Sequence, residues 1–96
     1  MDKRIAIVTG ASNGIGRAIT KRLCDDGCFV IGVDVDELQG AELVSEIGQA
    51  SCAFFKCDVS KEKDVQQLFR TVIQRFHRID ILVNNAGIIR DNMIWK

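Results

Sequence analysis

Short runs of apolar residues, many of them β-branched, alternate along this chain with longer segments of helical periodicity. The apolar runs predict four strands, over Ile5–Thr9, Cys28–Asp34, Ala53–Cys57 and Ile79–Asn84. The run Phe29-Val30-Ile31 lacks the strict alternation of a half-exposed strand, which is typical of strands that are covered on both faces.

The segments between these strands predict three amphipathic helices. The first covers Gly14–Asp26 and stops at Gly27, the second covers Glu37–Ile47 with Asp36 as its N-cap, and the third follows Ser60 as its N-cap. A further helix is expected to begin over Asp91–Lys96. The residues expected to face the core are Ile15, Ala18, Ile19 and Leu23 in the first helix, Leu38, Ala41, Val44 and Ile47 in the second, and Val65, Leu68, Phe69, Val72, Ile73 and Phe76 in the third.

This element order predicts an α/β fold with a parallel sheet. Short connections and right-handed crossovers place helices on both faces of the sheet. We expect a partial doubly wound sheet of four strands in the order 3-2-1-4, with three helices, that is incomplete after the fourth strand. We expect residues 1–96 to be the incomplete half of one such domain, with no internal repeat, no linker and no proline to mark a boundary.

Composition and charge narrow the kinds of function that this chain could have. The formal net charge is zero, so no basic field attracts nucleic acid or an anionic membrane. No apolar run is long enough to cross a bilayer, and no signal peptide is evident, so a cytoplasmic location is expected. Cys24, Cys28, Cys52 and Cys57 could pair as zinc ligands, but their placement on predicted helices and strands favours reduced, mostly buried thiols and no metal site.

The most informative segment is the glycine-rich turn between the first strand and the first helix. Gly10 lets the backbone leave the strand in a tight turn, Gly14 has no Cβ to block a phosphate, and Gly16 lets the helix pack closely on the strand. The helix start offers free N–H groups to a pyrophosphate, and Ser12 and Asn13 can add hydrogen bonds. A structural turn without a ligand is the alternative.

One acidic residue, Asp34, ends the second predicted strand, and another, Asp58, directly follows the third. Asp34 can accept hydrogen bonds from the ribose hydroxyls of an adenosine and would repel a 2′-phosphate, so NAD is favoured over NADP. Asp58 lies at the same sheet edge and can accept the adenine amino group. For each residue the alternative is an Asp that only shapes its own turn.

The fourth strand ends in Asn84-Asn85-Ala86-Gly87 at the same edge. Its small residues leave room for the central riboses of a dinucleotide, and its Asn side chains can tie neighbouring loops together. A plain strand-ending turn is the alternative.

These motifs together resemble the N-terminal half of the short-chain dehydrogenase/reductase family, whose members carry a seven-stranded Rossmann sheet. The resemblance covers the whole chain. It implies hydride transfer between NAD or NADP and a carbonyl or alcohol substrate. It also implies that Asn85 holds the sheet together. The residues implied to bind the cofactor are Gly10, Ser12, Asn13, Gly14, Ile15 and Gly16 for the phosphates, Asp34 for the ribose, Asp58 and Val59 for the adenine, and Asn84, Ala86 and Gly87 for the adjoining ribose region.

The segment from Ile88 to Met93 is similar to a stretch of 3-oxoacyl-thioester reductases, although many of those lack an acid at the position of Asp34. The family's catalytic Ser, Tyr-x-x-x-Lys pair and catalytic Asn lie beyond this stretch, and the chain has no Tyr. We therefore assign no catalytic residue, give none of this chemistry to Asn92 or to His77, and expect the chain to be inactive alone.

The main interpretation is that this chain is the cofactor-binding portion of an oxidoreductase. The alternatives to it are a stand-alone nucleotide-binding module and an inactive truncated fragment. Because Ile81-Leu82-Val83 is apolar and lacks a following strand in the predicted order, its edge carries unpaired backbone groups. We therefore expect self-association through that edge.

Overall fold

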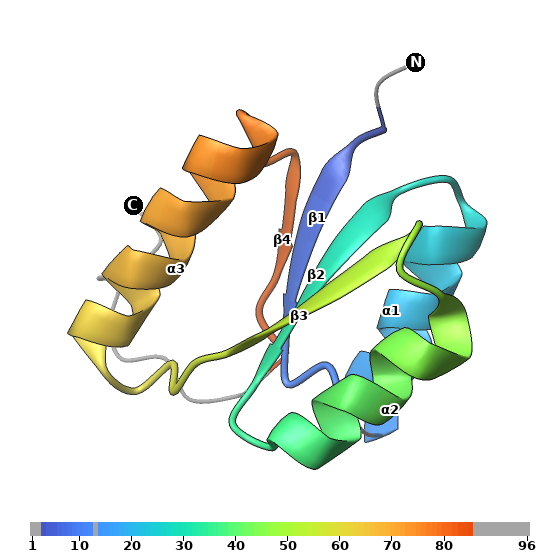
Figure 1. Cartoon of the computed structure of the whole chain (residues 1–96), viewed down its shortest axis with the longest axis horizontal. Coiled ribbons are helices and arrows are strands. Elements are labelled where there is room, and N and C mark those ends of the chain that lie inside the picture. The colour runs from blue at the N-terminus through green and yellow to red at the C-terminus, as the bar shows by residue number, and fades with distance from the viewer. Residues whose placement is uncertain (1–2, 13, 86–96) are drawn as a thin grey trace.

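The computed structural model describes residues 3–12 and 14–85. Its strands form one parallel sheet in the order β3-β2-β1-β4, as predicted. Helix α3 covers one face, and α1 and α2 cover the other (Figure 1). The elements are β1 (Ile5–Thr9), α1 (Gly14–Asp25), β2 (Phe29–Asp34), α2 (Glu37–Ile47), β3 (Cys52–Lys56), α3 (Glu62–Phe76) and β4 (Ile81–Val83).

Some predicted boundaries are wrong by one or two residues. Strand β2 starts one residue later than expected, β3 is shifted back by one, and α1 ends at Asp25. Strand β4 is shorter than expected at both ends. At its start, Asp80 instead joins Ile5 through its main chain (Asp80 N to Ile5 O, 2.8 Å) and its side chain (Ile5 N to Asp80 Oδ2, 2.8 Å). The Arg78 guanidinium and the Ile5 N–H hold the pKa of Asp80 below its usual range.

Strand β1 forms the centre of the core and is buried throughout. Its side chains alternate between the two faces. Ile5 and Ile7 pack toward α3, and Ala6 and Val8 pack toward α1 and α2. The sheet is therefore covered on both sides, as the absence of polar alternation in the sequence predicted.

The prediction for the inner face of α1 is partly wrong. Ile15 is 72% exposed and Ala18 is exposed, whereas Gly16 and Thr20 are buried. Ile19 packs at the edge of the core, as expected. Gly16 and Thr20 are the buried residues of this helix, and the Thr20 hydroxyl is satisfied because it donates to Gly16 O at 2.8 Å.

Helix α2 is rotated in the same way relative to the prediction. Leu38 is 80% exposed and Ala41 is exposed, whereas Gly40 and Leu43 are buried. A Cβ on Gly40 would lie 2.5 Å from atoms of the Phe54 ring, so that ring occupies the space of a side chain on the helix. Val44 and Ile47, also predicted to face inward, do pack against the core.

Helix α3 largely follows its predicted face. Val65, Leu68 and Val72 are buried, and Phe69 and Phe76 are partly buried against them, but Ile73 is 47% exposed. His77 ends the helix in the left-handed conformation and is exposed, as expected.

The two predicted N-caps have different outcomes. Asp36 caps α2, because its side chain accepts a hydrogen bond from Gln39 N. Ser60 does not cap α3. The N-cap is Lys61, which makes no side-chain capping bond, and the Ser60 hydroxyl donates to Asp58 Oδ1 at 2.6 Å. The hydroxyl proton is used in the preceding turn and the side chain does not serve the helix.

The cysteines are all free thiols, and Cys28, Cys52 and Cys57 are buried. Burial raises the pKa of Cys52 to about 12 and that of Cys57 to about 11. Within residues 3–12 and 14–85, no cluster of three or more His, Cys, Asp or Glu side chains could hold a metal ion. No helix in this part of the chain has the length and hydropathy of a membrane span.

A pair of leucines in α2 tests which face of this helix is buried. We expect Leu43→Ala to lower the free energy of unfolding by about 2–4 kcal/mol, because it opens a cavity at a fully buried position. Leu38→Ala lies on the same helix but is 80% exposed, so it serves as the control. It should change the free energy of unfolding by less than about 0.5 kcal/mol. Urea denaturation monitored by circular dichroism measures both, and equal effects would contradict this assignment.

Candidate functional site

The glycine-rich turn lies at the carboxyl end of β1 and leads directly into α1. Gly10 leaves the strand with a φ of 64°, and Gly14 begins the helix with a φ of 59°. Both values lie in the left-handed region that favours glycine. A Cβ on Gly14 would meet nothing within 4 Å, so the space beside the helix start is open to a ligand.

Gly16 has a different role, because no side chain fits there. A Cβ on Gly16 would lie 1.8 Å from Gly10 O and 2.7 Å from Asn85 Nδ2. The first turn of α1 therefore rests on the backbone that leaves β1. This contact aims the N–H groups of the helix start toward the carboxyl edge of the sheet.

Asp34 ends β2 beside this turn and is bonded to it. Its Oδ2 accepts hydrogen bonds from Ser12 Oγ at 2.6 Å and from Ser12 N at 3.2 Å. Its Oδ1 accepts one from Val35 N at 2.8 Å. The residue thus shapes its own turn, as the alternative interpretation held, and also joins the glycine-rich turn.

Arg17 holds the same turn from the helix side. Its Nη1 donates to Ser12 O at 3.0 Å, and its Nη2 pairs with Glu46 Oε1 at 2.5 Å. Glu46 also pairs with Lys21, and the two cations hold the pKa of its carboxyl below the usual range, with Lys21 the larger cause. The turn is connected in this way to both α1 and α2.

The end of β4 is fastened to the end of β1 by hydrogen bonds. Thr9 Oγ1 accepts one from Asn85 N at 2.9 Å, and Asn85 Nδ2 donates to Gly10 O at 3.3 Å. Asn84 is exposed, with its Oδ1 3.3 Å from Thr9 Oγ1. Asn85 therefore ties two strands together, in agreement with the role implied by the family resemblance.

Asp58 follows β3 at the same edge and has different partners from Asp34. Its Oδ1 accepts hydrogen bonds from Ser60 Oγ at 2.6 Å and from Ser60 N at 3.0 Å. The hydrogen bond from the Ser60 side chain is the largest cause that holds the pKa of Asp58 below its usual range. The bond from Ser60 N and the charge of nearby Lys61 act in the same direction. The neighbouring Val59 is partly buried against the core.

The predicted site residues within the described part of the chain all lie at or beside the carboxyl ends of the parallel strands. Asn13, Ala86 and Gly87 lie outside the described residues. Sequence reasoning did not assign Arg17 or Thr9 to the site. Thr9 was predicted only as the end of the first strand, because its long-range bond to Asn85 has no local signal in the sequence, and neither does the bond from Arg17 to Ser12.

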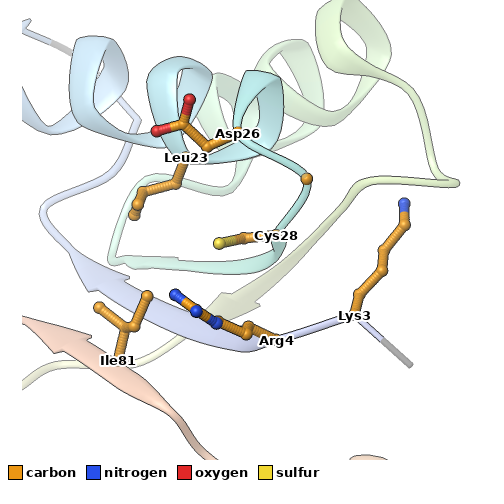
Figure 2. A pocket seen from close by; sticks show the side chains of 7 residues that line it. Lys3, Arg4, Leu23, Asp26, Cys28 and Ile81 are labelled. Atoms are coloured by element: carbon orange, nitrogen blue, oxygen red, sulfur yellow. The ribbon is translucent and has the colours of Figure 1, made fainter. Parts of the chain in front are cut away.

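A pocket of about 570 Å³ lies at the opposite end of the sheet (Figure 2). Arg4 and Cys28, which immediately precede β1 and β2, line it together with Leu23 and Ile81. No predicted site residue contributes to it. The candidate dinucleotide site therefore rests on the glycine-rich turn and its neighbours, not on this cavity.

Comparison with known proteins places the chain in a family. The family model described as "short chain dehydrogenase" matches residues 4–96. A 3beta-hydroxysteroid dehydrogenase of Mediterraneibacter gnavus is 40% identical over 90 residues, which cover 92% of this chain and 33% of that protein. A 3-oxoacyl-[acyl-carrier-protein] reductase of Haemophilus influenzae is 41% identical over 96 residues, which cover 100% of this chain and 39% of that protein.

Solved structures give the same result. A 3-ketoacyl-(acyl-carrier-protein) reductase from Brucella melitensis, complexed with NADH, superposes with a TM-score of 0.83 at 37% identity, covering 91% of this chain and 35% of that one. A metagenomic short-chain oxidoreductase in complex with NADP superposes with a TM-score of 0.85 at 33% identity, covering 92% of this chain and 41% of that one.

The chain spans about a third of the length of the curated relatives that it matches. Within that span, the strand order, the glycine-rich turn and the acid at the end of β2 are in place. The chain belongs to the short-chain dehydrogenase family and carries a Rossmann-type region of the kind that binds nicotinamide cofactors.

Proposed function

We propose that this chain is the NAD-binding portion of an oxidoreductase that moves hydride between a nicotinamide cofactor and a carbonyl or alcohol. One observation carries the proposal: an open helix start and the carboxylate of Asp34 lie on the same sheet edge and are joined by hydrogen bonds through Ser12. A diphosphate needs the first feature, and a ribose needs the second.

The residues fit a dinucleotide at this edge. The free space beside Gly14 suits a diphosphate, and the amide groups of the turn at Gly10 and Gly16, with the helix start at Ile15, would bind it. When bound, the nicotinamide ring supplies or accepts a hydride. The chain's own part is to bind and orient the adenosine and diphosphate.

The remaining predicted residues would bind the other parts of the dinucleotide. The Oδ2 of Asp58 would accept the adenine amino group, because both hydrogen bonds from Ser60 go to Oδ1. Val59 would lie against the adenine ring. Asn84, Ala86 and Gly87 would border the adjoining ribose at the end of β4.

Asp34 supports a preference for NAD over NADP. Its carboxylate can accept a ribose hydroxyl and would repel a 2′-phosphate at the same place. In the described part of the chain, the Asp34 carboxylate is hydrogen-bonded by Ser12 and Val35 and by no cation. Arg17, which donates to the glycine-rich turn at Ser12 O, is also paired with Glu46.

The substrate class follows from the family: a small carbonyl or alcohol compound, with a 3-oxoacyl thioester as one candidate. That candidate is supported by the reductase of Haemophilus influenzae, which matches over the whole chain. Relatives of similar identity are named for other substrates, among them farnesol and L-fucose. We expect the 96-residue chain alone to be inactive, since it contains no Tyr, the proton donor that the family resemblance implies.

Two acids close in sequence test the proposed role of Asp34. We expect Asp34→Asn to weaken NAD binding by about tenfold or more, because hydrogen bonds to a charged acceptor contribute roughly 1.5–3 kcal/mol. The same change should bring the dissociation constants of NAD and NADP closer together. Isothermal titration calorimetry of the purified chain with each nucleotide measures both effects.

Asp36→Asn is the matched control. It removes the same charge two residues away, and asparagine caps a helix as well as aspartate does. We expect it to change NAD affinity by less than about twofold. If the two variants behave alike, Asp34 acts through general charge only, and if the wild-type chain releases no heat with NAD, the proposed function is wrong.

We also propose that the 96-residue chain self-associates through β4. In the described part of the chain β4 pairs only with β1, and its three apolar residues are each only partly buried. An apolar strand with an unpaired edge is prone to pair with another copy. Size-exclusion chromatography with light scattering should show a mass that rises with concentration above 10.7 kDa, and a constant monomer mass would contradict this.

A further inference from the structure

We infer that Ser12 is a positioning residue for Asp34 and does not donate its hydroxyl to the cofactor phosphates. The inference rests on the proposed function, since it concerns how the carboxylate that receives the ribose is held. It differs from the sequence-based expectation, which placed Ser12 among the residues that bind the phosphates. The contacts and burial of Ser12 and the contacts of Asp34 support this inference.

The hydroxyl proton of Ser12 is already used in a hydrogen bond within the protein. A serine hydroxyl donates one hydrogen bond, and that of Ser12 goes to Asp34 Oδ2 at 2.6 Å. This length is typical of a charge-assisted bond to a carboxylate, which is stronger than a bond between neutral groups. A phosphate oxygen accepts but does not donate, so binding it through Ser12 Oγ would require breaking this bond.

The Ser12 side chain is also inaccessible from outside the protein. Ser12 is fully buried, with a relative exposure of 0%, although it belongs to the glycine-rich turn. Its main chain is held from both sides, because its N–H donates to Asp34 Oδ2 and its carbonyl accepts from Arg17 Nη1. A hydroxyl on such a fixed residue is poorly placed to reach a ligand outside, but it is well placed to fix its neighbour.

Asp34 can still accept one more hydrogen bond in addition to those it already has. An ionised carboxylate offers about four acceptor positions. Ser12 takes two on Oδ2 and Val35 N takes one on Oδ1. The remaining position is on Oδ1, so the bonds from Ser12 orient the carboxylate such that Oδ1 is the oxygen left for a ribose hydroxyl. Ser12 thereby contributes to NAD recognition without touching NAD.

The experiment is a double-mutant cycle with two nucleotides. The four proteins are the wild-type chain, Ser12→Ala, Asp34→Ala and the double variant, each titrated with NAD and with NADP by calorimetry. We expect Ser12→Ala to weaken NAD binding by about five- to tenfold, as for loss of a bond to a charged group. In the Asp34→Ala background the same change should alter NAD affinity by less than about twofold.

NADP distinguishes positioning from phosphate binding. If Ser12 acts through Asp34, Ser12→Ala weakens NADP binding less than NAD binding, because the 2′-phosphate replaces a hydroxyl that could donate to the carboxylate and only the 3′-hydroxyl remains. If Ser12 instead binds the diphosphate, Ser12→Ala weakens both nucleotides equally and does so with or without Asp34. That result would overturn the inference while leaving the proposed function intact.

A second variant guards against a simple packing defect. Ser12→Cys keeps a side chain at the buried position but donates only weakly, so it should weaken NAD binding as Ser12→Ala does and weaken NADP binding less. Retention of wild-type NAD affinity by this variant would overturn the inference. Thermal unfolding of each variant, followed by circular dichroism, establishes that the proteins compared are folded. Failure of the wild-type chain to bind either nucleotide would instead refute the proposed function, and the inference with it.

Discussion

The arrangement of the candidate site depends on one close contact, where the first turn of α1 rests on the backbone that leaves β1. A single added carbon on Gly16 would lie 1.8 Å from Gly10 O, so the contact requires the absence of a side chain. It places the start of α1 directly against the end of β1. The amide groups of the helix start, the carboxylate at the end of β2 and the loop after β4 are neighbours as a consequence.

Hydrogen bonds between different strand ends then hold these neighbours in place. Ser12 connects the glycine-rich turn to β2 through Asp34, and Asn85 connects β4 to Thr9 and Gly10. Parallel strands make this possible because their carboxyl ends meet at one edge of the sheet. Packing of apolar residues sets the sheet, and a small number of polar contacts sets the relative positions of its loops.

The sequence predicted the strand order and the glycine-rich turn but not the orientation of two helices. Strands could be predicted because their apolar runs are short, bounded and separated by helical segments. The faces of α1 and α2 could not be fully predicted, because apolar periodicity gives no weight to glycine, whereas Gly16 and Gly40 are buried in these helices. Gly16 and Gly40 leave space that Gly10 and Phe54 occupy, and residues such as Ile15 and Leu38 remain exposed.

Asp34 and Asp58 show why a local pattern does not settle the role of a residue. Asp34 ends β2 and Asp58 follows β3, and each accepts two hydrogen bonds from one serine. The serine of Asp58 lies two residues later, so that contact forms within one turn. The serine of Asp34 lies twenty-two residues earlier, on the turn after β1. Only a contact of the second kind couples two loops, and it arises from the pairing of β1 with β2 rather than from the residues beside Asp34. The position of Asp34 therefore depends on the glycine-rich turn, so a ligand that binds one of them meets the other in a fixed place.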